Sequence, residues 1–165
     1  MASPGEYVPD VTEGIARVED LPSPHQERRQ RNYRRRRCPR CGRSAGRCGL
    51  AQRTLHDLGN ARSGRPIDLV VTYSKHRCCR CRRCFNAAMD DLALPKCHYT
   101  HRVRHTAVRL VVEDGLPYRS ASWHLWRDHR VFVPWATIQN WVQAAGKKKR
   151  GPPGGRLPRR RPAEL

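Results

Sequence analysis

Acidic residues are scarce in this chain of 165 residues, which carries 14 Asp and Glu against 34 Lys and Arg. The resulting formal charge of +20 destabilises a compact fold through self-repulsion unless a polyanion neutralises it. Lys and Arg side chains release the counterions that are condensed on nucleic acid, so a nucleic acid is the natural polyanion. The charge balance therefore predicts a nucleic-acid partner.

Apolar residues are also few, at 38% of the chain, and no stretch approaches the roughly 18 consecutive apolar residues of a membrane-spanning helix. The opening stretch MASPGEYVPDVTEG is acidic and rich in Pro and Gly, so it has no charged and then apolar secretion signal. No internal repeat is present. We therefore expect a cytoplasmic, nucleoid-associated protein with no membrane partner.

Cysteine, by contrast, is concentrated in one place. The stretch KHRCCRCRRCF, residues 75–85, holds four of the eight cysteines. In a reducing compartment such clustered thiols indicate metal binding more than disulfides. A redox centre would suit a lone CxxC that precedes a helix, and the two cysteine pairs of this chain do not match that arrangement.

A first metal-binding knuckle is predicted at Cys38-Pro39-Arg40-Cys41-Gly42, because two sulfurs three positions apart can face one ion. Gly42 permits the positive φ of the tight turn that follows. The second knuckle has two alternatives, Cys78 with Cys81 or Cys81 with Cys84. We favour Cys78 with Cys81 because Cys78 ends a predicted strand, where a knuckle should start. Cys84 is the alternative ligand. The favoured zinc ligands are Cys38, Cys41, Cys78 and Cys81. Spare thiols are expected at Cys48, Cys79 and Cys97, and strand residues rather than ligands at His56 and His76.

The residues between the knuckles predict a β-hairpin. RTLHDL (53–58) forms a possible first strand, and GNARSGRP (59–66) is typical of a turn. In the next strand Ile67, Leu69, Val71 and Tyr73 alternate with polar residues and share one face. A knuckle, a hairpin and a second knuckle together make a zinc ribbon, and the arginines between the later thiols can offset its negative charge.

Three helices are predicted after residue 99. Helical spacing of apolar residues covers 100–114, a second helix starts after Pro117 and ends near 128 or 129, and a third runs from Pro134 to Gly146. The buried positions of the three helices are expected to be Val103, Ala107, Leu110, Val111, Ala121, Leu125, Ile138, Trp141, Val142 and Ala145. Trp126 and Trp141 should fill the core, and Trp135 should pack at the start of the last helix.

The last helix places Gln139, Asn140 and Gln143 opposite its apolar side. Three helices with a short last helix suggest a helix-turn-helix, in which Gln and Asn can bond adenine N6 and N7 in the major groove. The predicted DNA-binding residues are Gln139, Asn140, Gln143, Arg119, Lys147, Lys148 and Lys149.

Four segments follow from these patterns. Residues 1–30 are expected to be an acidic disordered segment, 31–96 a zinc-ribbon module, 97–146 a helix-turn-helix module, and 147–165 a basic disordered tail. The fold class is accordingly small α+β, with a β-hairpin module before a three-helix module. Seven arginines at 28–37 and the basic tail should add affinity without sequence preference.

The order of CPRCG, a strand pair, a second knuckle with Phe85, YTHRVRHTAVRLVVEDGLPYRSAS and VPWATIQNWV resembles the N-terminal region of ISL-three insertion-sequence transposases. The resemblance covers roughly residues 36–145. It implies a zinc ribbon and a helix-turn-helix that bind the terminal inverted repeats of the element. In full-length relatives a ribonuclease-H-like domain with three metal-binding acids follows, and this sequence has no counterpart of that domain. The extra cysteines of the second knuckle and Val133-Pro134 before the last helix depart from the family pattern.

We therefore expect a non-catalytic protein that binds double-stranded DNA, such as a truncated or split transposase. One alternative is a zinc-ribbon RNA-binding or ribosome-associated protein. Another is a DNA-binding subunit whose catalytic domain lies on a separate transposase chain. A homodimer is compatible with each of these hypotheses.

Overall fold

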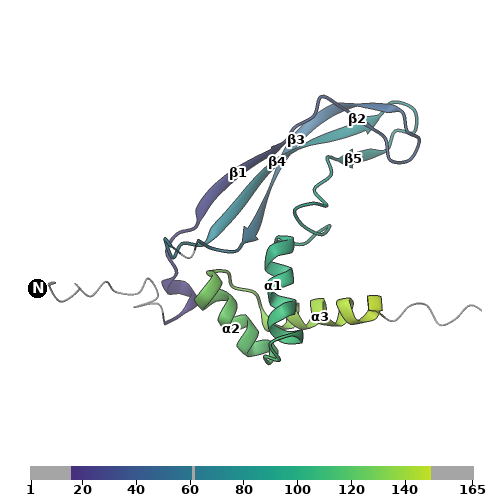
Figure 1. The fold of residues 1–165 in the computed structure, drawn as a ribbon. Helices are drawn as coiled ribbons and strands as arrows, with labels where there is room; N and C mark the ends of the chain where they lie inside the picture. The colour runs from purple at the N-terminus through teal and green to yellow at the C-terminus, as the bar shows by residue number, and fades with distance from the viewer. Residues whose placement is uncertain (1–15, 61, 150–165) are drawn as a thin grey trace, which may run out of the picture.

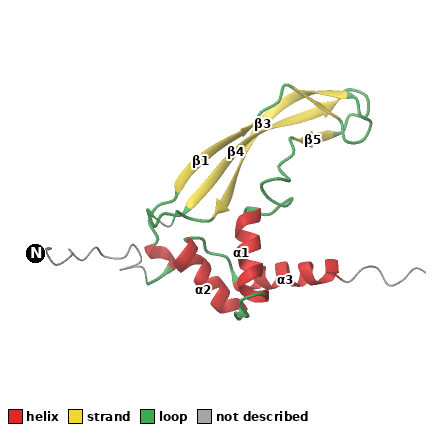
Figure 2. Ribbon diagram, in the orientation of Figure 1, coloured by secondary structure: helices red, strands yellow, loops and turns green. Residues whose placement is uncertain are grey.

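The computed structural model describes residues 16–60 and 62–149 and shows a small α+β fold (Figure 1). A five-stranded sheet extends away from three helices, which gather at one of its ends (Figure 2). The elements in chain order are η1 Val18–Asp20, β1 His25–Arg31, β2 Arg35–Arg37, β3 Ser44–Asp57, β4 Ile67–Cys78, β5 Cys84–Asn86, α1 His101–Val112, α2 Tyr118–His129 and α3 Trp135–Lys149.

The sheet has the order β1-β4-β3-β2, with β5 paired to β4 beyond the end of β1. The predicted hairpin is confirmed, because β3 and β4 pair in antiparallel fashion from Asp57↔Ile67 to Ala45↔Cys78. β3 is longer than the stretch 53–58 that the sequence predicts. It begins at Ser44 and contains a bulge between Arg47 and Gly49. The hairpin therefore carries both cysteine knuckles at the end of the sheet far from the helices (Figure 1).

The strand β1 contradicts the expectation that residues 1–30 are disordered, and it moves the start of the sheet module before residue 31. It runs parallel to β4, from His25↔Ile67 to Arg31↔Tyr73. Its sequence HQERRQR has no apolar residue, so backbone hydrogen bonds to β4 hold the strand in the sheet. Past its end, the Tyr33 N–H donates to the buried Ser74 Oγ at 3.1 Å. Residues 1–15 and 150–165, and with them part of both predicted tails, lie outside the described residues.

The sheet is covered on one face by the segment that leads to α1. Leu55 on β3 and Leu69 and Val71 on β4 are buried against Ala93, and Met89 and Leu92 pack on the same cluster. Leu69 and Val71 lie on the predicted apolar face of the strand, which is confirmed. This small core stabilises the half of the sheet that lies nearer the helices.

The helices begin and end close to their predicted positions. Thr100 caps α1 by accepting from the Val103 N–H at 3.4 Å, and Gly115 after the helix has φ +70°. α2 ends before Arg130, which adopts the left-handed conformation. α3 does not end at Gly146 as predicted but continues to Lys149, because a single glycine costs a helix only about 1 kcal/mol.

One apolar core joins the three helices, and its buried members are Val103, Ala107, Ala121, Leu125, Val131, Val133, Ile138 and Trp141. The predicted positions Leu110, Val111 and Val142 are partly buried against it. Trp126 is buried, as is Trp141, which confirms their predicted place in the core. Trp135 is the first residue of α3, and 44% of its surface is exposed.

The sheet and the helices meet at a closely packed joint. Thr100 Oγ1 donates to Asp57 Oδ1 at 2.7 Å, and the Gly59 N–H donates to the His129 carbonyl at 2.7 Å. A Cβ atom at Gly59 would lie 2.4 Å from the Cβ of Arg130, so a side chain at Gly59 would collide with the segment after α2. The joint therefore tolerates glycine but no larger residue.

Candidate metal centre and nucleic-acid interface

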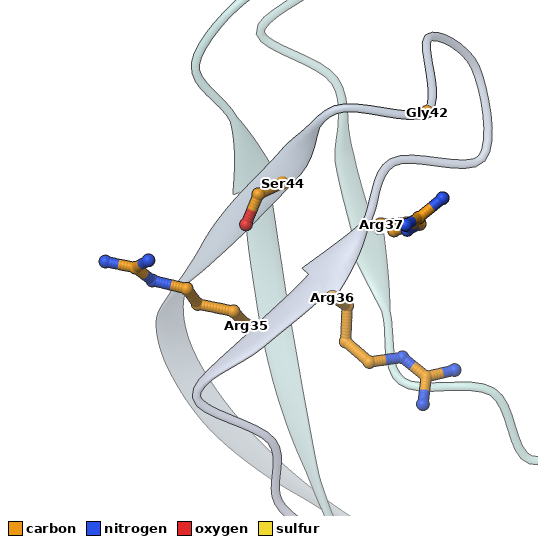
Figure 3. Close-up of a pocket in the computed structure, with 5 residues that line it drawn as sticks. All are labelled: Arg35, Arg36, Arg37, Gly42 and Ser44. Atoms are coloured by element: carbon orange, nitrogen blue, oxygen red, sulfur yellow. The ribbon is translucent and has the colours of Figure 1, made fainter.

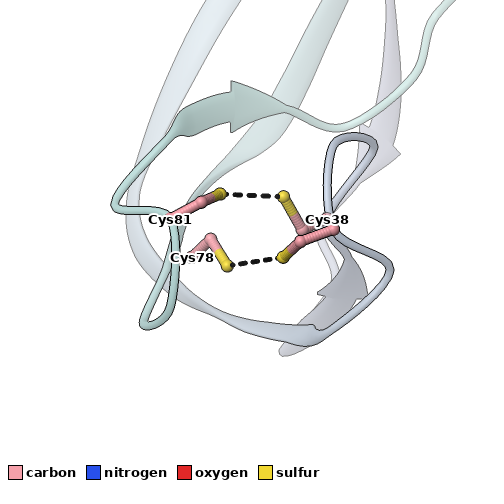
Figure 4. Close-up of side chains that lie close together, drawn as sticks. Cys38, Cys78 and Cys81 are labelled. Atoms are coloured by element: carbon pink, nitrogen blue, oxygen red, sulfur yellow. Dashed lines mark hydrogen bonds between the residues drawn. The ribbon is translucent and has the colours of Figure 1, made fainter.

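Four cysteine sulfurs converge between the two knuckles. The Sγ atoms of Cys38, Cys41, Cys78 and Cys81 all lie within 4.8 Å of one another. The sulfurs of Cys38 and Cys81 face each other at 3.5 Å (Figure 4). Those of Cys41 and Cys78 lie 3.4 Å apart. Cys38 and Cys78 are buried, and the other two are half-buried. The structure thus brings together the four ligands that the sequence favours.

This arrangement fits a single metal ion. Four thiolates at about 2.3 Å from a tetrahedral zinc ion would lie about 3.8 Å apart, which is near the observed separations. A disulfide would need about 2.0 Å between two sulfurs, so these thiols are not bonded in pairs. Four protein ligands leave no open position for a substrate, which is typical of a structural rather than a catalytic site.

The two knuckles repeat the same backbone turn. The Cys38 N–H donates to the Arg43 carbonyl at 2.8 Å, and the Cys78 N–H donates to the Arg83 carbonyl at 3.0 Å. The residue after the second cysteine is left-handed in both, with φ +69° at Gly42 and +54° at Arg82. The second knuckle therefore forms although arginine stands where the first has glycine.

Replacing Arg82 with glycine should raise the free energy of unfolding by roughly 0.5–1 kcal/mol. The left-handed conformation costs a residue with a side chain about 1–2 kcal/mol, and the greater freedom of glycine in the unfolded chain offsets part of the gain. Chemical denaturation of the full chain measures the change. Gly42→Ala is the matched control and should lower the stability by about 1 kcal/mol. A loss of stability in Arg82→Gly would contradict this reading of the turn.

Backbone amides in each knuckle favour the charged form of one thiol. The Cys41 N–H lowers the pKa of Cys38, and the Cys81 N–H lowers the pKa of Cys78 to about 6. The Arg43 N–H also lowers the pKa of Cys41, but the facing Cys78 thiol and burial outweigh it and raise that pKa to about 11. Because a metal binds the deprotonated thiolates, the raised pKa of Cys41 means that metal binding should release a proton.

The remaining cysteines lie outside the cluster. Cys84, the alternative ligand, is exposed on β5 and lies outside the cluster of four sulfurs. Cys48 and Cys79 are exposed and Cys97 is half-buried, in agreement with spare thiols. His76 is a strand residue as predicted; it is buried, stacks on Phe85 and hydrogen-bonds to Ser74 Oγ at 2.8 Å.

His56 is likewise a strand residue, on β3, and is not a metal ligand among the described residues. Its Nδ1 lies 2.8 Å from the Asp68 carboxylate of the neighbouring strand. Its ring contacts Tyr99 with 5.6 Å between centroids. His56 therefore helps to join the sheet to the segment before α1.

A basic hollow lies beside the first knuckle. Arg35, Arg36 and Arg37 of β2 line it with Gly42 and Ser44, and it has a volume of ≈ 480 Å³ (Figure 3). The side chains of Arg35 and Arg36 project away from the strand in Figure 3, and Arg36 lies over the Tyr33 ring at 4.5 Å. No acid lines the hollow. Figure 3 draws Arg35 to one side of the strand and Arg36 and Arg37 to the other. Guanidinium groups suit phosphate oxygens, which arginine binds with two parallel hydrogen bonds.

The predicted DNA-binding residues lie at the other end of the molecule, on α2 and α3 (Figure 1). Asn140, Gln143 and Lys147 are exposed on α3, whereas Gln139 is half-buried. Arg119 is exposed near the start of α2. Lys148 and Lys149 belong to the last turn of α3, but their side chains lie outside the described residues. The structure thus separates the thiols from these residues by the length of the sheet.

Two aromatic residues near Arg119 are exposed. Trp123 on α2 and Trp135 at the start of α3 are 51% and 44% exposed. The sequence left Trp123 free to stack or to contact sugar, and it assigned Trp135 to the fold. The available signal was the spacing of Arg119, Trp123 and Arg127, which places the three on one face of a helix.

No family model, no curated protein and no solved structure matches this chain. Within residues 16–60 and 62–149, no helix has the length and apolar character that crossing a membrane requires.

Proposed function

We propose that this protein binds double-stranded DNA with sequence preference, through a helix-turn-helix formed by α2 and α3. One observation carries the proposal. α3 buries Ile138 and Trp141 against the other helices and exposes Asn140, Gln143 and Lys147 on its outer side. Amide side chains on an exposed helix suit the edges of adenine in the major groove, and the lysine suits a phosphate.

The geometry of the helices supports this proposal. α2 and α3 are 12 and 15 residues long, and the connection Arg130–Pro134 joins them. In helix-turn-helix proteins the second of these helices enters the major groove. The connection here is longer than the usual turn of three or four residues, and the buried Val131 and Val133 fix it to the helical core.

We further propose that the cysteine centre binds zinc and forms a zinc ribbon with β3 and β4. Four thiolates in a closed tetrahedral arrangement favour zinc or iron among the common metals, and zinc is the usual ion in structural sites of this kind. In this role the ion holds the basic hollow of β2 in place, so the ribbon supplies contacts to phosphates. The formal charge of +20 supports the same conclusion, because such contacts supply most non-specific affinity.

The resemblance to ISL-three transposases supports an origin in such an element, with its terminal inverted repeats as the DNA target. In this proposal the chain binds DNA and does not cut it. A catalytic transposase chain would then be a partner. Cleavage of a supercoiled plasmid by the purified protein with magnesium would contradict the non-catalytic role.

Replacing Gln139, Asn140 and Gln143 together with alanine should reduce sequence preference. Each lost amide–adenine pair removes about 1–3 kcal/mol of discrimination, so the preference should fall by roughly tenfold or more. The test first selects duplexes for the wild-type protein from a random pool. Fluorescence anisotropy at a fixed salt concentration then compares the selected duplex with a scrambled one.

Gln52→Ala is the matched control, because this exposed amide lies on β3 away from the helices. It should leave both affinities unchanged. The triple variant should keep its affinity for the scrambled duplex, because phosphate contacts supply that affinity. An unchanged preference would show that other residues read the bases. Equal wild-type affinity for structured RNA would favour the RNA-binding alternative.

A further inference from the structure

One face of α2 carries a cation, an indole and a second cation in succession. Arg119, Trp123 and Arg127 lie at i, i+4 and i+8 of this helix and so share a face. The guanidinium carbon of Arg127 lies 4.3 Å from the centroid of the Trp123 ring. Trp126 supports the same ring from the core side, edge to face with 5.9 Å between centroids. Trp123 is thus fixed in place without being buried.

The start of α3 adds a second indole to this face. The guanidinium carbon of Arg119 lies 5.6 Å from the centroid of the Trp135 ring. Arg119 also lines, with Ser120, Trp123 and His124, a hollow of ≈ 350 Å³. Arg119 therefore adjoins both tryptophans. We call Arg119, Trp123, Arg127 and Trp135 the Arg–Trp patch.

The two indoles of this patch do not serve the core. Trp123 and Trp135 are 51% and 44% exposed, whereas Trp126 and Trp141 are buried. Arg and Trp are the residue types that most often dominate binding surfaces, since each offers a large planar contact. Their pairing on exposed positions indicates a ligand with planar groups.

The charge of the patch defines the ligand further. Arg119 and Arg127 contribute two positive charges. The neighbouring Asp128 carboxylate accepts a hydrogen bond from His124 Nδ1 or pairs with the charged ring, at 2.7 Å. No acid lines the hollow beside Trp123. A ligand with planar rings and negative charges matches this surface.

We propose that the Arg–Trp patch binds unpaired nucleotides of single-stranded DNA. The exposed faces of bases stack on Trp123 and Trp135, and the arginines hold the phosphates between them. Aromatic rings beside arginine are the usual means of binding single strands, because every base offers a ring face. In a duplex these faces are covered by neighbouring base pairs, so the patch favours unpaired bases. The inference rests on the proposed DNA-binding function but uses a site distinct from the amide face of α3.

Oligothymidylate of 12 nucleotides is the probe for this site, with the full chain and tryptophan fluorescence quenching as the readout. The wild type should bind it with quenching, because stacked bases quench indoles. Trp123→Ala and Trp135→Ala should each weaken the affinity by about 5- to 100-fold, since one stacked base is worth about 1–3 kcal/mol. Trp123→Phe should retain most of the affinity, because a smaller ring still stacks. The affinity for the selected duplex should change less than twofold in these variants.

Phe132→Ala is the matched control, since Phe132 is an exposed aromatic residue outside the patch with 45% exposure. It should bind oligothymidylate as the wild type does. Circular dichroism checks that each variant is folded. If an alanine variant does not fold, Trp123→Phe still tests the site.

The inference would be overturned by any of these results: no binding of oligothymidylate by the wild type, unchanged binding by both alanine variants, or an equal loss of duplex binding. Tighter binding of oligouridylate than of oligothymidylate would reassign the patch to RNA and also overturn it. A different outcome separates the two proposals. If the patch variants lose affinity for oligothymidylate while the wild type selects no duplex sequence, the proposed function fails and this inference stands.

Discussion

Replacing Cys78 with serine should abolish metal binding and unfold the far end of the sheet, while the three helices stay folded. Cys78 is fully buried at the end of β4, and its sulfur faces Cys41 at 3.4 Å. Serine provides no soft sulfur ligand, so one corner of the tetrahedral site is lost. Elemental analysis of reduced protein should fall from about one zinc per chain to none.

The expected effect is large because the far end of the sheet has almost no apolar core. Its buried cluster contains Cys38, Ala45 and Cys78, with only Cys41, Cys81 and Phe85 packed against it. Structural zinc binds small metal-folded peptides with about 10–16 kcal/mol, which is also the scale of the stability of a whole domain. Hydrogen exchange should therefore show loss of protection in β2, β5 and the adjoining ends of β3 and β4.

Cys84→Ser is the matched control, because Cys84 is exposed and lies in the same stretch but outside the cluster. It should keep its metal and its protection. Acid should act like the Cys78 substitution, because protons compete with the metal for the four thiolates and the metal affinity therefore falls as the pH falls. Zinc retained by Cys78→Ser, or lost by Cys84→Ser, would contradict this ligand set.

Leu125→Ala should destabilise the three-helix unit by about 2–5 kcal/mol, because it removes a fully buried side chain from the centre of the helical core. All four tryptophans lie on α2 and α3, so their fluorescence during chemical denaturation reports on this unit. The midpoint should move to lower denaturant, and the metal content should not change.

Val112→Ala is the control for this substitution. It truncates an apolar side chain on α1 that is 59% exposed, and its effect should stay within about 0.5 kcal/mol. If Leu125→Ala also released the metal, the sheet end and the helices would unfold as one unit. That result would contradict the separation of the two cores.

Patterns that depend on local sequence were predictable. The helices at 101–112 and 118–129 follow from the spacing of residues such as Val103, Ala107 and Leu125, because one buried face suffices to define a helix. The convergence of Cys38 and Cys41 with the later cysteines followed from ligand spacing. The choice of Cys78 over Cys84 rested only on where a strand should end, and β4 does end at Cys78.

Features that depend on tertiary contacts were not predictable. β1 pairs with a strand about 40 residues away and has no apolar pattern, so nothing in HQERRQR marks it as a strand. Arg82 adopts the left-handed conformation that glycine adopts at the matching position of the first knuckle, Gly42. Nothing in the local sequence indicates this, because the surrounding knuckle imposes the conformation. Trp135 is exposed at the start of α3, whereas Ile138 and Trp141 of the same helix are buried in the core.

Gly59 lies at the joint between the two ends of the molecule that we propose contact DNA. The close approach of its backbone to His129 and Arg130 makes this joint one of the contacts between the sheet and the helices. The arginines near the cysteine centre and the amides of α3 lie on opposite sides of this joint, at the two ends of the molecule (Figure 1). Because a duplex turns once in about 10 base pairs, inserting five base pairs between the two contacted stretches would rotate one of them to the opposite side. If the proposed DNA binding uses both ends of the molecule, the affinity would depend on the number of base pairs between the two stretches as well as on their sequence.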